Sequence, residues 1–465
     1  MNDLLKIFFI WSGIAVMAAS LHAQSVEFSN ARTMGMARGS MVTSHGLDAV
    51  GLNPANLGFG DRSEFSVSVF PLGLHVGTNF MTWERFEKYF SGVETDSGKK
   101  GTYLTDADKE DILDGFQDGI GKLTAGGAVT LFGISFVDST LGGFAFTVNE
   151  RFGATATLPD DYIRLLFFGN PVGSRYEFSG TGGDAQWMRE YALHYGRSLP
   201  LSLGPISLAG GVSLKLLHGF AFGGIDDFSG MIQTDSGGAL TAELRQRLRR
   251  SVVDAMSDTA GGSVGIFPAP AGTGFGMDLG VSARFGTAFS AGMSITDIGS
   301  MTWTRNAKEL RGDAHVSITD PTSKSERDSI TDAFKTSENP LESFDTELPT
   351  VLRIGVAVDV NQLPIMKAMP GQMVVELDYI QGLNSSVGNT TSPRFALGVE
   401  YRLLDWLPIR SGLAFGGYER VHWGLGTGLN FDVFDLEIGT EDIIPILAPS
   451  AMSTASFAFG MRVRF

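Results

Sequence analysis

The feature that most constrains this chain is the alternation of its last residues, Thr454 to Phe465. Every second position holds a bulky apolar side chain: Phe457, Phe459, Met461, Val463 and Phe465. The positions between them hold Ala458, Gly460, Arg462 and Arg464. Successive side chains of a strand point to opposite faces, so one face of this strand is apolar and the other is small or charged. A strand with lipid on one side and a wet lumen on the other has this pattern.

The composition favours strands over helices. Of the 465 residues, 60 are glycine, nearly twice the usual share of about 7%. Glycine weakens helices and is tolerated in strands where other backbone approaches closely. Cysteine is absent, which excludes disulfides, thiolate metal sites and a thiol nucleophile. The net charge of −16 argues against nucleic acid as a partner, because phosphate binding requires a basic surface.

The N-terminus has the pattern of a secretory signal. Lys6 precedes an apolar run, Ile7 to Ala19, and Ala23 stands at the expected cleavage site. The run is too short to span a membrane comfortably, so an anchor is the less favoured alternative. We expect residues 1–23 to be a signal peptide. No other run reaches the roughly 18 apolar residues of a helical span, so we expect an exported chain without a helical anchor.

The segment that follows the signal does not alternate like a strand. Gly46-Leu47-Asp48-Ala49-Val50 leads into Asn53-Pro54-Ala55-Asn56-Leu57. Pro54 fixes its own φ and biases Asn53 away from helix, which predicts a tight turn.

A Gly-x-Asp-Ala-Val-x-x-Asn-Pro-Ala-x-Leu segment after a signal peptide resembles the N-terminal plug of the long-chain fatty-acid transporter superfamily of outer-membrane barrels. The chain thus resembles transporters of hydrophobic compounds. Asn53, Pro54 and Ala55 match the plug turn, and the order of segments is similar to a poorly characterised branch. The resemblance implies a hatch or plug over residues 24–60 and an outer-membrane barrel over 61–465. The C-terminal strand resembles the closing strand of such barrels, in which the alternating residues ending at Phe465 act as the assembly signal.

Alternating segments recur along the rest of the chain and predict an all-β, transmembrane antiparallel barrel of about fourteen strands. The expected strands are 62–80 with an irregularity at Pro71, 124–137, 139–153, 184–199, 204–222, 274–286, 287–297, 349–361, 371–382, 391–404, 407–417, 419–430, 431–439 and 454–465. Helical patches are expected in the external loops, near 82–90, 105–119 and 162–168. A charged stretch, Glu243 to Arg250, is a candidate extension of a hairpin.

The face opposite the apolar positions is predicted to line the lumen, and it carries both signs of charge. The predicted lumen-facing residues are Asp278, Arg284, Arg353, Asp359, Glu376, Asp378, Glu400, Arg402, Arg462 and Arg464. Bracing of wall against plug is the favoured role, because ion selectivity would favour one sign; a polar route is the alternative. Gly424, Gly426 and Gly428 would either let the plug approach or relieve twist.

Two apolar stretches interrupt the polar loops. One contains Ile163, Leu165, Leu166, Phe167 and Phe168, and the other runs from Ile443 to Leu447. Exposed contiguous apolar residues pack together or meet a partner. One hypothesis is an external groove through which a hydrophobic ligand enters, as the resemblance implies; loop-on-loop packing is the alternative.

No catalytic or metal-binding constellation stands out, so we expect neither an enzyme nor a cofactor or metal. The sequence favours a barrel in the bacterial outer membrane for passive uptake of small, fatty-acid-like hydrophobic compounds. A structural or secretion-associated barrel without a transported substrate is the alternative. The expected partners are outer-membrane lipid, the barrel-assembly machinery and a small hydrophobic ligand.

Overall fold

The computed structural model describes residues 29–68, 70–95, 98–101, 103–257, 265, 267–319, 323, 326, 336–417 and 421–465. The predicted signal peptide and residues 24–28 of the predicted plug lie outside these ranges.

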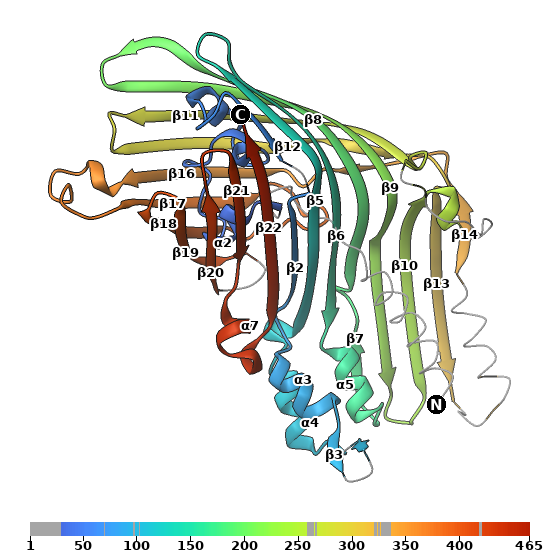
Figure 1. Cartoon of the computed structure of the whole chain (residues 1–465). Helices are drawn as coiled ribbons and strands as arrows, with labels where there is room; N and C mark the ends of the chain where they lie inside the picture. Colours follow the sequence, from blue (N-terminus) through green and yellow to red (C-terminus); the bar gives the residue numbers. More distant parts are fainter. Residues whose placement is uncertain are drawn as a thin grey trace.

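Within the described residues, fourteen antiparallel strands close into a barrel (Figure 1). The first strand is in two pieces, β1 (Phe65–Ser68) and β2 (Leu72–Thr78). The others are β5 (Ile120–Asp138), β6 (Gly142–Pro159), β8 (Gly182–Leu203), β9 (Ile206–Thr234), β11 (Gly272–Phe285), β12 (Phe289–Trp303), β16 (Val351–Asp359), β17 (Gln372–Gly382), β18 (Arg394–Leu404), β19 (Leu407–Gly416), β20 (Val421–Asn430), β21 (Phe434–Thr440) and β22 (Thr454–Arg464). Because β22 pairs with both β1 and β2, the wall has no free edge.

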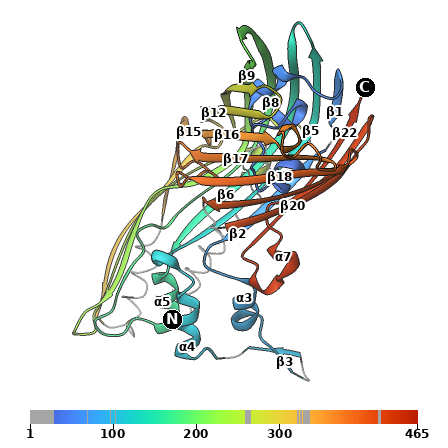
Figure 2. The same ribbon diagram turned by 90° about the vertical axis from the view of Figure 1, so that its left-hand side faces the viewer.

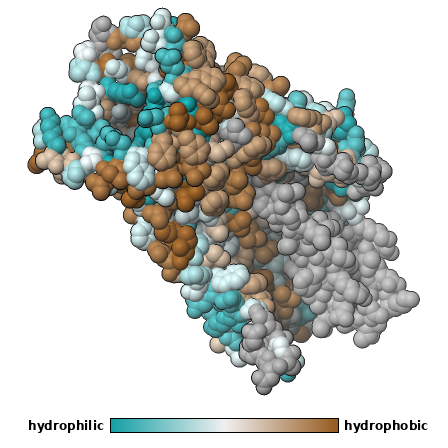
Figure 3. All heavy atoms as spheres, viewed as in Figure 1, coloured by the Kyte–Doolittle hydropathy of each residue, from teal (hydrophilic) through white to brown (hydrophobic). Residues whose placement is uncertain are grey.

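The alternation in the sequence becomes an outer and an inner face. On β16, Ile354 and Val356 point outward and are 44% and 52% exposed, whereas Arg353, which directly precedes Ile354, is buried. Figure 3 shows apolar residues gathered over the wall formed by β2, β5, β21 and β22. The predicted fold class, an all-β transmembrane barrel of about fourteen strands, is confirmed. Among the described residues, no helix is long and apolar enough to cross a membrane.

The two ends of the barrel differ, and we call the end with the long connections the external end. In Figures 1 and 2 the helices of these connections lie beyond one end of the strands, and the C-terminus lies at the other. The helices are α3 (Trp83–Phe90), α4 (Asp106–Leu113), α5 (Asp161–Phe168) and α7 (Ile444–Leu447). The short strands are β3 (Val93–Thr95), β4 (Gly98–Lys100), β7 (Arg175–Glu177), β14 (Ser337–Pro340) and β15 (Phe344–Glu347). The predicted helical patches therefore correspond to α3, α4 and α5.

Two long stretches that were expected to lie between strands contain strand in the structure. The strand expected to end at 222 continues to Thr234 and pairs with β10 (Leu240–Val252), so the charged stretch does extend a hairpin. No strand was expected between 287–297 and 349–361, but residues 298–348 hold the end of β12, then β13 (Lys308–Ile318), β14 and β15. Beyond the lipid, neither face of a strand needs a continuous apolar row, so the alternation that marks the wall disappears.

Residues 29–60 lie inside the barrel rather than in its wall. They form α2 (Ala31–Gly35) and two 3-10 turns, η2 (Gly46–Ala49) and η3 (Pro54–Phe59). We call this stretch the inner segment. The η3 turn contacts β6, β8, β9 and β11, and α2 contacts the wall from β19 to β22. The inner segment therefore touches wall strands on opposite parts of the barrel.

Candidate functional site

The predicted turn at Asn53, Pro54 and Ala55 binds the inner face of β11. Asn53 is fully buried, and its Nδ2 donates to the carbonyl of Val281 at 3.2 Å and to Ser282 Oγ at 3.0 Å. Its Oδ1 accepts from the Ala55 amide at 3.1 Å, so the same side chain caps η3. One asparagine therefore both shapes the turn and attaches it to the wall.

Two carboxylates of β17 hold the next part of the inner segment by its backbone. Glu376 accepts hydrogen bonds from the amides of Val42 and Thr43, the second at 3.1 Å. Asp378, two residues along the same face, accepts from the Met41 amide at 2.9 Å. Both carboxylates are fully buried. Three consecutive amides thus find acceptors on the wall, a geometry that does not depend on the side chains at 41 and 42.

Ion pairs add further attachments. Asp48 of η2 binds Arg462 of β22, with Oδ1 and Nη2 2.5 Å apart. Burial would raise the pKa of the Asp48 carboxyl, but the Arg462 guanidinium outweighs burial and lowers it below its ordinary value of 3.8. Asp48 is therefore a charged group at neutral pH, and it fixes η2 against the closing strand.

A chain of alternating charges leads from α2 across three wall strands. Arg32 of α2 binds Glu400 of β18 at 2.9 Å. Arg410 of β19 binds the same Glu400 at 2.6 Å and Glu437 of β21 at 2.7 Å. Arg402 reaches Glu400 at 3.0 Å. Buried charges that are paired and hydrogen-bonded are tolerated, whereas the loss of one partner is costly.

Glycines of the wall let the inner segment come within backbone distance. A Cβ on Gly412 would lie 2.3 Å from the Met36 carbonyl, and one on Gly426 would lie 2.9 Å from Gly35 Cα. A Cβ on Gly424 would meet Ala37 N at 2.7 Å, whereas Gly428 faces only wall residues. Of the two alternatives for the three glycines, close approach therefore holds at Gly424 and Gly426.

The inner face of β9 shows three levels along the barrel. Gly211 lies against η3, since a Cβ there would be 2.3 Å from Ala55 N. Lys215, four residues on, is buried among charged groups, and Leu217 is buried among apolar ones. Because β9 runs toward the external end, the order from outside is an apolar level, a charged level and the inner segment.

The charged level is a ladder across neighbouring strands, which we call the charge ladder. Arg151 of β6 binds Glu190 of β8 at 2.7 Å and Asp297 of β12 at 3.0 Å. Lys215 binds Asp297 and Asp278 of β11, each at 2.7 Å. All five side chains are at most 3% exposed.

The apolar level is a buried cluster of the external half of the lumen, which we call the apolar cluster. It joins wall residues to residues of the external connections. Its buried members are Met188, Leu217, Phe220, Phe222, Val253, Ala271, Met301, Trp303, Ala307, Phe344, Leu348 and Val387. The Phe222 ring lies 5.5 Å from Trp303 and 5.6 Å from Phe344. External connections therefore contribute apolar side chains to this level of the lumen.

The remaining predicted residues fall into different places. Arg353 is buried and donates to Thr296 Oγ1 at 2.8 Å, and Arg464 pairs with Asp435 of β21 at 2.5 Å. Arg284 lies at the end of β11 with its guanidinium over the Phe59 ring. Asp359 ends β16 and caps the following turn.

The predicted apolar patch on α5 and the C-terminal row are exposed to different degrees. The predicted external patch lies on α5, where Leu166 is 44% exposed and Phe168 is 36% exposed. Ile163, Leu165 and Phe167 on the same helix are half-buried. The alternating C-terminal residues point outward from β22: Phe457, Phe459, Met461, Val463 and Phe465 are exposed or half-buried.

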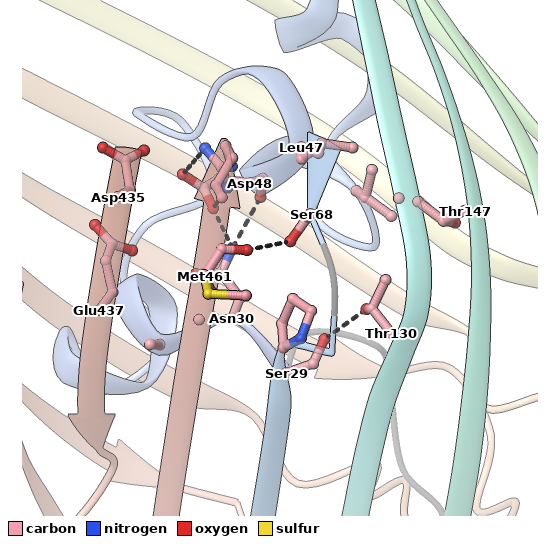
Figure 4. Close-up of a pocket in the computed structure, with 16 residues that line it drawn as sticks. Ser29, Asn30, Leu47, Asp48, Ser68, Thr130, Thr147, Asp435, Glu437 and Met461 are labelled. Carbon is pink, nitrogen blue, oxygen red and sulfur yellow. Dashed lines mark hydrogen bonds and ion pairs between the residues drawn. The ribbon is translucent and has the colours of Figure 1, made fainter. Parts of the chain in front are cut away.

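A cavity of about 60 Å³ lies where the inner segment meets the broken first strand (Figure 4). Asp48 borders it from η2, and Ser68 and Pro71 border it from the break between β1 and β2. Phe70, inside the break, has a φ of 55° and is 57% exposed. Positive φ is uncommon for a bulky residue, so the wall is locally irregular here.

Sequence reasoning missed several residues that the structure brings together. Arg32, Glu437 and Glu441 were not singled out, nor were Lys215 and Arg410. Yet Lys215 stands between the outward residues Leu214 and Leu216, and Arg410 follows the outward Ile409. The alternation of inward and outward positions along each strand was the signal that could have identified the wall residues among them. Glu441, just past β21, binds Arg38 of the inner segment at 2.9 Å. In the described residues, no group of three or more His, Asp or Glu is arranged to hold a metal ion.

The fold and its interior define a transmembrane β-barrel whose lumen contains its own N-terminal segment. Residues 57–441 match the model of DUF5723, described as a family of unknown function, and the chain belongs to that family. No curated protein matches the sequence.

Several solved barrels resemble the whole chain. A TodX deltaS2S3 mutant, described as a monoaromatic hydrocarbon channel, matches at 11% identity and a TM-score of 0.47 over 94% of this chain and 98% of that one. The toluene transporter TbuX of Ralstonia pickettii matches at 10% identity and a TM-score of 0.44, over 95% of this chain and 99% of that one. A FadL homologue of Pseudomonas aeruginosa matches at 11% identity and a TM-score of 0.40, over 95% of this chain and 98% of that one. At these values the barrel assignment rests on this chain's own strand pairings.

Proposed function

We propose that this protein is a bacterial outer-membrane barrel that passes small hydrophobic, fatty-acid-like compounds passively, with the inner segment as its plug. The observation that carries the proposal is the order of levels in the lumen: an apolar cluster on the external side, then the charge ladder, then a segment attached to the wall by polar bonds. An apolar compound that enters from outside meets the apolar level first. No catalytic residue or cofactor is part of the proposal.

The external patch on α5 would be the first contact for such a compound. Leu166 and Phe168 are exposed there, and α5 directly follows β6 at the external end. The charge ladder would oppose straight passage of an apolar compound, because displacing buried ion pairs is costly. The route therefore requires either movement of the plug or a lateral opening of the wall, for which the break at Pro71 is the candidate.

The small size of the cavity beside the break also requires such a movement. The cavity beside the break has a volume of about 60 Å³, whereas an apolar cavity that binds benzene measures about 150 Å³. The many bonds between plug and wall favour the second candidate, a structural or secretion-associated barrel in which the plug never moves.

Native mass spectrometry of the protein purified in mild detergent, followed by extraction of bound lipid, separates the two candidates. A stoichiometric apolar ligand is expected for uptake, and its absence from protein prepared with several detergents would refute it. The plug is tested separately by deleting residues 26–58 and measuring conductance in planar bilayers. A large increase in single-barrel current is expected, and an unchanged current in a barrel that still folds would contradict the assignment.

A further inference from the structure

Two short external helices, which both contact the turn η7 (Pro449–Ala451), expose large apolar side chains, which we call the aromatic ridge. It consists of Trp83, Phe86 and Phe90 of α3 and of Ile446 and Leu447 of α7. On α3 the spacing of three and four residues places the rings in one row, with centroids 5.5 Å and 6.1 Å apart. Phe90 is 49% exposed and Ile446 is 70% exposed.

The ridge is not the surface by which α3 packs on the protein. Tyr89 is buried and its hydroxyl donates to Asp111 of α4, which also pairs with Arg85 at 3.3 Å. Polar contacts therefore fix the helix from a neighbouring side and leave the aromatic row outside. A soluble surface rarely exposes such a row without a partner.

The ridge begins where the lipid-facing wall ends. The Trp83 amide donates to the Met452 carbonyl at 2.7 Å, two residues before β22 starts at Thr454. On the adjoining β2, Leu74 and Val76 point outward and are 56% and 55% exposed. Both views place α3 and α7 just beyond the ends of β2 and β22 (Figures 1 and 2). The apolar surface of the wall thus continues onto the two helices.

We propose that the aromatic ridge inserts into the interface of the outer lipid leaflet and holds the external end of the β2–β22 seam at the membrane surface. Aromatic side chains are enriched at membrane–water interfaces, and an amphipathic helix lying there buries its apolar face about 5–10 Å deep. Glu84 and Lys88 lie on the opposite side of α3, as this placement requires.

This assignment gives the two apolar stretches noted in the sequence different roles: the stretch on α7 contacts lipid, and only the stretch on α5 is proposed to contact ligand. On α5, Tyr162 stacks on Phe178 at 4.3 Å. In Figure 1 this helix lies just beyond β7 and not at the ends of β2 and β22. The ridge therefore contacts lipid, and the ligand patch of the proposed function stays on α5. The inference depends on the barrel lying in a membrane and does not depend on transport.

Tryptophan fluorescence tests the proposal, because few tryptophans compete with Trp83. Trp303 is buried and Trp187 packs against the apolar cluster. Trp406 and Trp423 are exposed, so both are replaced by phenylalanine in the background protein. This protein is reconstituted into phosphatidylcholine vesicles that carry bromine at shallow or at central positions of the acyl chains. The matched control adds Trp83→Phe to the same background.

Shallow bromines are expected to quench the background protein more than central ones, and this depth-dependent loss is expected to vanish in the Trp83→Phe control. Heat-modified gel migration verifies that both barrels are folded. Equal bromine quenching with and without Trp83, together with quenching of Trp83 by aqueous iodide, would overturn the proposal. Protection of Trp83 from both quenchers would also overturn it, since a protein partner or a second copy would then cover the ridge.

Discussion

The pair formed by Asp48 and Arg462 offers the sharpest test of how the wall holds the inner segment. Asp48→Asn keeps the side-chain size but leaves the guanidinium without its anion, at a site where the two side chains are 12% and 11% exposed. Removal of one partner of a buried ion pair costs about 3–5 kcal/mol. That corresponds to roughly two to almost four powers of ten in the equilibrium between the seated and displaced segment.

The neighbouring pair of Arg464 and Asp435 is a matched control. It lies two residues along β22, is 4% and 5% exposed with atoms 2.5 Å apart, and joins two wall strands. Asp435→Asn should lower the unfolding temperature of the barrel without releasing the segment. Planar-bilayer recording should show brief openings for Asp48→Asn and none for Asp435→Asn. Equal conductance of the two variants would refute the reasoning.

The pair of Asp48 and Arg462 also determines the pH range in which the inner segment stays attached to the wall. The pKa of Asp48 is lowered in the folded protein, so its stabilising contribution is complete above the ordinary value of 3.8 and is lost as the pH falls through the lowered value. The wild-type barrel should conduct equally little at pH 7 and pH 5 and open only in stronger acid. Asp48→Asn should lack that acid-induced step, and a wild-type opening near pH 6 would contradict the assigned role.

Three further predictions concern packing, ligand contact and assembly. Gly412→Ala should increase protease cleavage of the inner segment, since its Cβ would meet the Met36 carbonyl, whereas Gly210→Ala has nothing within 4 Å and should not. Leu166→Ser combined with Phe168→Ser should reduce bound apolar ligand severalfold in native mass spectra while heat-modified migration is unchanged. Phe465→Ala should reduce the amount of folded barrel in cells more than it lowers the stability of refolded protein, and an equal effect on both would argue against an assembly signal.

The strands of the wall could be predicted from the sequence because contact with lipid restricts which side chains can face outward. Every spanning strand must turn apolar side chains outward at every second position, so Ile354 and Val356, or Phe457 and Phe459, identify their strands without reference to any other part of the chain. The same parity placed Glu376 and Asp378 on the inner face.

The partners of those inner residues were decided only by the closed barrel. Asp48 and Arg462, or Arg32 and Glu400, are hundreds of residues apart in sequence. Alternation along a strand tells which face a residue lies on, but not its level along the barrel or the residue it meets. The bonds from Asp378 and Glu376 to the backbone amides of Met41 and Val42 leave no trace in the side chains at these two positions. Local alternation therefore determined that this chain is a membrane barrel, whereas closure of the wall around the inner segment decided which charges meet.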